Sequence, residues 1–402
     1  MRLGADRLVA RLRYVTRTAR GLLQHPGFEG TRVTPRRLAN LWRARWEHRE
    51  LRTELRSLPI KLILEATNIC NLSCPACFTG DGQVGRARSH MSLELYHKLL
   101  DELGPTLWRI ELCNWGEPLL GRHVVPMIEA ASARGISTLI STNFSVPFDA
   151  ARAERLVRSG LTILGVSIDG ARQESYERYR VGGDLATVLR NCRLVQEAKR
   201  KLRSKTPAVN WSFHVFPHNV EDVELARSMA GELEMTFVVE KGWVVGDEWD
   251  PDGRYCYYGE PKPFPCVYLW SYAVVNNDGG VAPCCGSFYR EDDMGHIAVT
   301  PDEVGATSFR EAWNGPRFRQ ARSLYRARDG GGEAARSICF DCPQTVIWER
   351  WQQHLGAGGT PETFRPGYGV NDIFNYFWSR RPERADRTPP GAGPPGDRSR
   401  AA

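Results

Sequence analysis

The chain has 402 residues, a formal net charge of +7 at pH 7, 42% hydrophobic residues and 25% charged residues. These proportions are ordinary for a soluble globular protein with one large domain and a smaller one, and much of the positive excess lies in arginines near the two ends, so they do not indicate a nucleic-acid groove. No apolar run approaches the roughly 18 residues that a membrane span requires, and Leu22-Leu23 is too short for a signal peptide, so we expect a cytoplasmic protein.

The chain contains 11 cysteines. Without an export signal, so many cysteines favour metal binding in a reducing compartment over a disulfide framework. They fall into two groups, with single cysteines at 113, 192 and 256. The first group is Cys70, Cys74 and Cys77, and the second is Cys266, Cys284, Cys285, Cys339 and Cys342. We therefore predict two metal centres.

Residues 1–58 alternate arginines with apolar residues at helical spacing, interrupted by Pro26-Gly27 and by Pro35. The apolar positions are Leu8, Val9, Leu12, Val15, Leu38, Leu41, Trp42 and Trp46. Such an amphipathic helical extension can pack on the main domain, or lie on a membrane surface or a partner. Packing is favoured, because surface helices with an apolar stripe usually cover a core.

From Pro59 onward, short β-rich apolar runs alternate with helical patterns. The runs are 60–66, 109–113, 136–142, 163–168, 209–216 and 235–240, and the helical patterns lie near 92–103, 123–134, 149–159, 184–202 and 219–232. Strands that alternate with helices predict right-handed parallel crossovers, and hence an α/β fold with a wound sheet or a partial barrel. Ligands of such sheets bind at the carboxyl ends of the strands.

The stretch from Cys70 to Phe78 follows the first predicted strand. Its cysteines could form a buried helical stripe, but Pro75 and the nearby Asn, Ser and Gly residues favour a loop. In a loop, three thiolates can hold an iron–sulfur cube and leave one iron open, whereas a zinc site would need a fourth ligand.

Further polar stretches follow the next three strands. They are Asn114-Trp115-Gly116-Glu117-Pro118, Ser141-Thr142-Asn143, and Ser167-Ile168-Asp169-Gly170 with Arg180 beyond it. Each stretch alone is common in turns, but they occur in order at strand ends. His214 and His218 near the fifth strand end are interpreted as structural, and Cys192 as a core residue. Cys113 ends the second strand facing the site, where packing is favoured.

At these residues the chain resembles the radical S-adenosylmethionine (radical SAM) superfamily, whose hallmark is C-x3-C-x2-C followed by an aromatic residue, here Phe78. The resemblance implies a partial (β/α)6 TIM-like barrel whose cluster binds S-adenosylmethionine through the open iron, cleaves it reductively and releases a 5'-deoxyadenosyl radical. It also implies a cofactor-binding set of Phe78, Gly116, Glu117, Thr142, Asn143, Ser167, Asp169 and Arg180. Trp115 departs from the family's G-G-E-P motif by replacing its first glycine. The resemblance also opens the alternatives of an adenine contact for His214 or His218 and of a hydrogen-atom donor for Cys113.

The second cysteine group can supply four thiolates from Cys266, Cys284, Cys339 and Cys342, with Cys285 as the alternative to Cys284. A hairpin turn is predicted at Asn277-Asp278-Gly279, and the spacing is not that of a zinc ribbon. The pattern, with Trp270, Trp313 and Asn314, resembles the SPASM domain in its short Twitch form. That implies a second 4Fe–4S cluster without an open iron, which serves electron transfer or structure.

We expect an N-terminal extension at 1–58, a radical SAM core at 59–241, a linker or lid at 242–265, an auxiliary-cluster domain of a hairpin plus a helix at 266–345, and a C-terminal extension at 346–402 that is disordered after about 380. Within the linker, Tyr255, Cys256, Tyr257 and Tyr258 either face the substrate or pack. Cys113, Cys256 and Tyr257 are the candidate catalytic residues.

The resemblance implies hydrogen abstraction from a substrate between the barrel mouth and the auxiliary domain. Its expected outcome is the net two-electron oxidation of a small sugar-like or aminocyclitol-like metabolite, with a flavodoxin or ferredoxin as the electron donor. The alternatives are maturation of a ribosomal peptide, by epimerisation or crosslinking, and a non-catalytic iron–sulfur or zinc scaffold.

Overall fold

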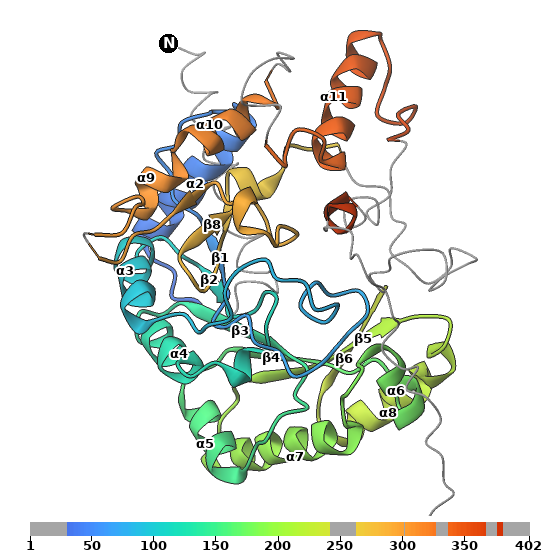
Figure 1. Ribbon diagram of the computed structural model, residues 1–402. Helices are drawn as coiled ribbons and strands as arrows, with labels where there is room; N and C mark the ends of the chain where they lie inside the picture. Colours follow the sequence, from blue (N-terminus) through green and yellow to red (C-terminus); the bar gives the residue numbers. More distant parts are fainter. Residues whose placement is uncertain (1–29, 242–262, 301, 327–336, 367–375, 381–402) are drawn as a thin grey trace, which may run out of the picture.

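The structure is a computed structural model that describes residues 30–241, 263–300, 302–326, 337–366 and 376–380. One nine-stranded sheet runs through it in the order β6-β5-β4-β3-β2-β1-β7-β8-β9. The strands are β1 Lys61–Leu64, β2 Arg109–Glu111, β3 Ser137–Thr142, β4 Ile163–Ser167, β5 Ala208–Val215, β6 Thr236–Lys241, β7 Tyr272–Val275, β8 Gly280–Ala282 and β9 Gly295–His296. The sheet does not close on itself in the described residues, which is the partial barrel that the sequence predicts (Figure 1).

Helices connect the strands of the predicted barrel. They are α3 Leu93–Leu103, α4 Val124–Ala133, α5 Ala150–Arg158, α6 Gln173–Tyr179, α7 Leu185–Leu202 and α8 Val223–Glu232. Side-chain oxygens of Ser92, Asp149 and Asp184 cap the first turns of α3, α5 and α7. All six predicted strands and the helical patterns between them are confirmed, whereas the short helix α6 was not predicted.

The sheet has two chemically different faces, which follow from the period-2 alternation of its strands. One face carries Leu62, Ile110, Ile140, Leu164 and Trp211, which are fully buried in the main core. The helices α3, α4, α5, α7 and α8 form an arc along the sheet (Figure 1). The opposite, inner face carries polar residues at paired positions, among them Glu111 on β2, Ser141 on β3 and Ser212 on β5.

The C-terminal part of the chain joins the same sheet instead of forming a separate one. Strand β7 pairs in parallel with β1, in the register Lys61 to Tyr272, and the predicted hairpin continues from β7 into antiparallel β8. This pairing covers the edge of β1, whose backbone groups would otherwise lack partners on that side. The described helices of this part are α9 Phe309–Trp313, α10 Pro316–Ser323 and α11 Pro343–Gly356.

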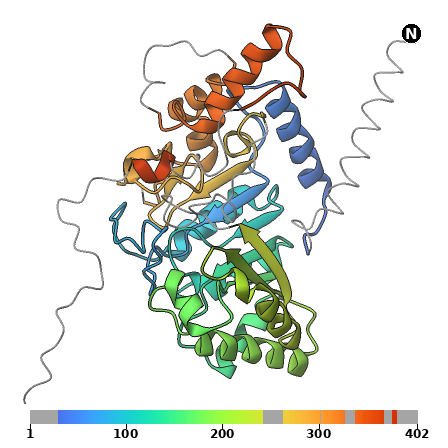
Figure 2. The ribbon, with the colours of Figure 1, turned by 90° about the vertical axis from the view of Figure 1, so that its right-hand side faces the viewer.

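Helix α2, Pro35–Arg49, packs on the domain as predicted, with Leu41 against Ile60 and Trp108 where β1 and β2 begin. The expected apolar stripe is wrong, however, because Leu38, Trp42 and Trp46 are 36%, 38% and 42% exposed. The buried face of α2 is instead determined largely by polar contacts. Arg37 donates to the carbonyl oxygen of Gly135 at 2.9 Å, and Glu47 accepts from the amide of Arg56 at 2.8 Å. Figure 2 shows α2 along the outside of the molecule.

Several predictions concern residues beyond the described part of the chain. These are the helical pattern of residues 8–15, the linker residues Tyr255, Cys256, Tyr257 and Tyr258, and the tail after about 380. Among the described helices, none has the length and apolar character to cross a membrane.

Candidate functional site

The cysteine loop lies at the carboxyl end of β1 and folds as turns, as the sequence predicts. The amide of Cys77 donates to the carbonyl oxygen of Cys74 at 3.2 Å, and the amide of Ser73 donates to that of Val181 at 3.0 Å. A Cβ atom at Gly80 would stand 2.4 Å from the carbonyl oxygen of Cys74, so this position requires glycine. The loop therefore closes tightly over Cys74.

The three thiols of this loop form one electrostatic group. Burial raises the pKa of Cys70 to about 11 and that of Cys77 to about 12, and neighbouring thiols add to both shifts. Arg180 Nη1 lies 3.9 Å from Cys74 Sγ, and Asn143 Nδ2 lies 3.7 Å from Cys70 Sγ. Three neighbouring thiols that are buried or half-buried and have N–H donors close by fit an iron–sulfur cluster, because coordination deprotonates a thiol outright.

No group of three or more His, Cys, Asp or Glu side chains within the described ranges is arranged to hold a metal ion. A single zinc ion needs every thiolate at about 2.3 Å. In a cluster each thiolate binds its own iron, so its cysteines need not converge on one point.

The predicted motif around Glu117 is brought together with Thr142 and Asn143. The Glu117 side chain, which is 2% exposed, accepts hydrogen bonds from Thr142 Oγ1 at 2.6 Å, from the amide of Asn143 at 2.7 Å and from the amide of Leu119 at 2.9 Å. Burial raises the pKa of Glu117, and these bonds offset part of the rise. Glu117 thus fixes the loops after β2 and β3 against each other.

Gly116 is required by close packing of the backbone. A Cβ atom there would lie 2.0 Å from the carbonyl oxygen of Thr67, so the loop after β2 rests directly on the loop that precedes Cys70. The two loops are also joined by the amide of Glu117, which donates to the carbonyl oxygen of Ile69 at 2.9 Å.

A second carboxylate, Asp169, organises the far side of the site. Its Oδ2 accepts from Arg180 Nε at 2.6 Å, and its Oδ1 accepts from the amide of His214 at 2.7 Å. Burial alone would raise the pKa of Asp169, but Arg180 and His214 outweigh it and lower that pKa to about 2. The predicted Arg180 is therefore held by Asp169 and directed towards Cys74. Ser167 lies two residues before Asp169 and is buried at the end of β4.

His214 has a structural role, as predicted, but one within the site. Its Nδ1 lies 3.0 Å from Asp169 Oδ1 and its Nε2 lies 3.3 Å from Glu240 Oε2. Burial would lower the pKa of His214, but the charge of Asp169 outweighs it and raises that pKa to about 9. The sequence reasoning missed Glu240, which is an acidic residue near the end of the sixth strand, where a polar contact to the site could have been sought.

Phe78 packs in an aromatic cluster that joins the two cysteine regions. Its ring stacks on Phe288 with centroids 4.9 Å apart, meets Trp115 edge-on at 5.0 Å and lies 4.9 Å from Trp378. Trp115, the departure from the family motif, also donates from Nε1 to the carbonyl oxygen of Ser287 at 3.2 Å. The cluster thus links the loop of Cys77 to the segment that follows Cys285.

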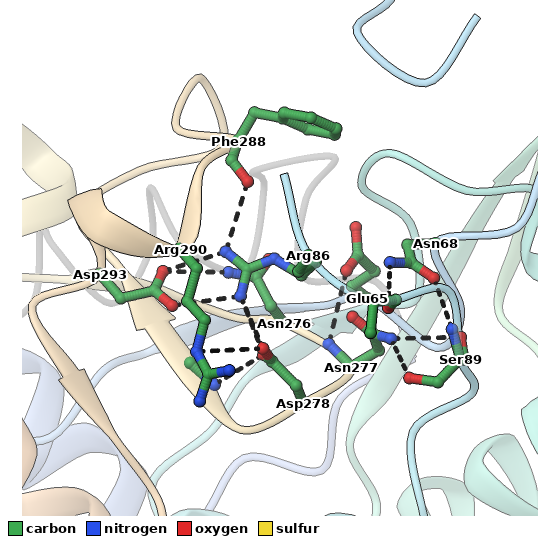
Figure 3. Close-up of polar contacts among 12 residues, drawn as sticks. Glu65, Asn68, Arg86, Ser89, Asn276, Asn277, Asp278, Phe288, Arg290 and Asp293 are labelled. Carbon is green, nitrogen blue, oxygen red and sulfur yellow. Dashed lines mark hydrogen bonds and ion pairs between the residues drawn. The ribbon is translucent and has the colours of Figure 1, made fainter. Parts of the chain in front are cut away.

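A buried polar network reinforces this link (Figure 3), and no sequence pattern indicated its central residue, Arg86. Arg86 Nη1 donates to Asp278 at 2.9 Å and to Asp293 at 3.1 Å. Beside it, Glu65 accepts from the amide of Trp115 at 3.3 Å and from that of Asn277 at 3.5 Å. Burial raises the pKa of Glu65 to about 7. The predicted hairpin turn is therefore bound to the cysteine loop region.

The second cysteine group separates its two adjacent members. Cys266, Cys339 and Cys342 all contribute to the raised pKa of Cys284, after burial and the charge of Cys285. Cys285 is exposed, and its Sγ lies 3.1 Å from Tyr268 Oη. The charge of Cys285 also raises the pKa of Cys266, so both adjacent thiols lie near the group, and the contact of Cys285 with Tyr268 favours Cys284 as the companion of the other three thiols.

Cys342 lies at the cap position of α11, where the helix dipole favours a thiolate. Cys192 is fully buried on α7, in agreement with its interpretation as a core residue.

Comparisons with known proteins agree with this geometry. Residues 64–229 match the Radical SAM superfamily, and residues 266–343 match SPASM, an iron–sulfur cluster-binding domain. Fe-coproporphyrin III synthase of Methanosarcina barkeri is 26% identical over 162 residues, which is 40% of this chain and 38% of the relative. PqqA peptide cyclase of Gluconobacter oxydans is 24% identical over 316 residues, which is 70% of this chain and 83% of the relative.

Among solved structures, SuiB of Streptococcus suis bound to S-adenosylmethionine is similar in fold, with a TM-score of 0.51 and 13% sequence identity over 77% of this chain and 78% of that one. The family uses a 4Fe–4S cluster and S-adenosylmethionine, and the SPASM domain implies further iron–sulfur binding. The chain is therefore a member of the radical SAM superfamily with a C-terminal SPASM domain.

Proposed function

We propose that Cys70, Cys74 and Cys77 hold the S-adenosylmethionine-cleaving cluster. The observation that carries this proposal is the group of three thiols at the carboxyl end of β1, with Cys74 buried and Cys70 and Cys77 half-buried, and with N–H donors of Asn143 and Arg180 directed at two of the sulfur atoms. When bound, the cluster and S-adenosylmethionine supply a 5'-deoxyadenosyl radical that abstracts hydrogen from the substrate. We assign the radical SAM core, which carries out this step, to residues 59–241.

The residues around the thiols position the nucleoside ligand. Glu117 and Asp169 are positioning residues, since their carboxylates hold Thr142, Asn143 and Arg180 in place. The backbone at Gly116 and the side chains of Asn143 and Ser167 are the groups that we assign to S-adenosylmethionine. Phe78 stabilises the cysteine loop through its aromatic contacts, among them the stacking on Phe288.

We further propose that Cys266, Cys284, Cys339 and Cys342, in residues 266–345, hold a second 4Fe–4S cluster that accepts an electron. The net reaction is then a two-electron oxidation of a small sugar-like or aminocyclitol-like metabolite, with a flavodoxin or ferredoxin as reductant. The polar inner face of the sheet supports a polar substrate of this kind.

Maturation of a ribosomal peptide is the second candidate function. It is favoured by the similarity to PqqA peptide cyclase, which extends over 70% of this chain. Crosslinking a peptide also removes two electrons, so it would use the same sulfur sites and differ from the first candidate in the substrate alone. Epimerisation is redox-neutral and would instead require a hydrogen-atom donor, for which Cys113 and Cys256 are the candidates.

The proposal is tested by anaerobic reconstitution with iron and sulfide, followed by S-adenosylmethionine and dithionite. We expect about eight irons per chain and formation of 5'-deoxyadenosine. The triple change of Cys70, Cys74 and Cys77 to Ala should leave about four irons and no 5'-deoxyadenosine, while the matched control Cys192→Ala should behave as the unchanged protein. Undiminished 5'-deoxyadenosine from the triple variant would refute the assignment, and none from the unchanged protein would favour a scaffold.

A further inference from the structure

Polar and sulfur-containing side chains gather on the inner face of the sheet beside the auxiliary cysteines. Lys61 of β1 and Glu111 of β2 share this face, because Lys61 is two residues before Ile63, the partner of Glu111. Lys61 Nζ lies 3.3 Å from Glu111 Oε2 and 4.4 Å from the centroid of the Tyr272 ring. We call Lys61, Glu111, Cys113, Tyr268 and Cys285 the inner polar cluster.

The two thiols of the inner polar cluster lie close to its ion pair. Burial raises the pKa of Cys113 to about 12; Glu111 and Cys285 add to the rise, and Lys61 opposes it. Burial also raises the pKa of Cys285, and again Glu111 adds to the rise while Lys61 opposes it. The Sγ atom of Cys285 lies 3.1 Å from Tyr268 Oη. The charges of the ion pair therefore act on both Cys113, two residues beyond β2, and Cys285, next to the auxiliary thiol Cys284.

The ion pair is shielded but reachable. The side chains of Lys61 and Glu111 are 20% and 15% exposed. Next to Glu111 along the inner face, Leu139 is half-buried and Ser141 is exposed. An ion pair that is largely withdrawn from water contributes little net stability, and apolar residues of similar volume often do as well. Its presence beside an open stretch of the inner face is therefore better explained by ligand binding than by packing.

We propose that the Lys61–Glu111 pair is the substrate-orienting element of this protein and that it takes a small molecule with adjacent hydroxyl or amino groups. The pair presents a donor and an acceptor 3.3 Å apart. A hydroxyl can accept from the ammonium while its neighbour donates to the carboxylate, so a polyol or an amino sugar satisfies both charges at once. Tyr268 and Cys285 bound the site on the side of the auxiliary thiols. This inference rests on the proposed function for the location of the reacting radical.

The test measures binding of myo-inositol and of glucosamine to the reconstituted protein with S-adenosylmethionine, by anaerobic isothermal titration calorimetry. We expect at least one probe to bind, and Glu111→Gln to weaken that binding at least tenfold. The matched control is Glu94→Gln, an exposed residue on α3, which should leave the affinity unchanged.

A second variant guards against loss of the fold. The double change Lys61→Met with Glu111→Gln removes both charges of the pair and keeps an amide oxygen as an acceptor for Arg109, whose Nη1 lies 3.9 Å from Glu111 Oε1. The thermal unfolding temperature should therefore stay near that of the unchanged protein while probe binding is lost. An affinity in both variants equal to that of the unchanged protein would overturn the proposal, as would the failure of both probes to bind the unchanged protein. Formation of 5'-deoxyadenosine without any probe reports separately on the proposed function.

Discussion

Glu117 shows how one buried carboxylate sets the geometry of the site. It accepts hydrogen bonds from two backbone amides and one hydroxyl on two different loops. A glutamine would offer a single acceptor oxygen and place an N–H group opposite one of these donors.

We therefore expect Glu117→Gln to lower the free energy of unfolding by about 1–3 kcal/mol and to weaken S-adenosylmethionine binding. Calorimetric unfolding and equilibrium binding of S-adenosylmethionine measure the two effects. Glu94→Gln, on the exposed side of α3, is the control, and a Glu117→Gln protein equal to it in both measurements would remove the positioning role.

Glu65 makes the stability of the protein depend on pH. Its pKa is raised from 4.5 to about 7 in the folded protein, first of all by burial. The folded state thus binds the proton more tightly than the unfolded state, so the free energy of unfolding falls as the pH rises from 4.5 to 7. The expected loss from this group is about 3 kcal/mol. Unfolding followed from pH 5 to pH 8 should show a shallower decline in Glu65→Gln than in the unchanged protein.

At the scale of the elements, hydrophobic alternation explains why the strands were predictable. Leu62, Ile110 and Leu164 occur in apolar runs of strand length, and each of those runs is a strand of the sheet. Turn residues predicted the hairpin after β7 in the same way.

Long-range partners explain what the sequence could not supply. The buried face of α2 is fixed by Arg37 and Glu47, whose backbone partners at Gly135 and Arg56 are distant in the chain or lie beyond the helix. Likewise, the roles of Arg86 and Glu240 depend on contacts to residues in other elements. A pattern of residue types near one position contains no information on such partners.

The hairpin of β7 and β8 depends on Arg86, whose side chain is 3% exposed and contacts Asp278 and Asp293. Removing a buried cation leaves its carboxylates uncompensated, so Arg86→Met should destabilise the protein by about 3–5 kcal/mol. The matched control is Arg290→Met, because Arg290 is 65% exposed and lies 3.9 Å from Asp278. Thermal unfolding of both variants gives the comparison, and equal stabilities would contradict the role of Arg86.

At the scale of the whole molecule, the two cysteine groups should act as separable centres. Changing Cys339 and Cys342 to Ser should lower the iron content from about eight to about four per chain and leave 5'-deoxyadenosine formation intact, since the loop of Cys70 keeps its own thiols. Iron analysis and chromatography of the nucleoside products measure the two quantities.

The same measurements distinguish the adjacent thiols. The charges of the other three auxiliary cysteines all act on Cys284, whereas Cys285 contacts Tyr268, so we expect Cys284→Ser to reduce the iron content and Cys285→Ser to leave it unchanged. The reverse result would assign the cluster to Cys285.

The two-faced sheet has a consequence for how such a protein can change. Leu62, Ile110 and Trp211 on the helix side belong to the hydrophobic core that stabilises the fold. Lys61, Glu111 and Ser141 on the other side of the sheet are not part of that core. If the Lys61–Glu111 pair orients the substrate as proposed, exchanges among the latter residues would change which molecules are recognised at little cost in stability. A lineage can thus acquire new chemistry by drift on one surface while the scaffold that holds its sulfur ligands persists.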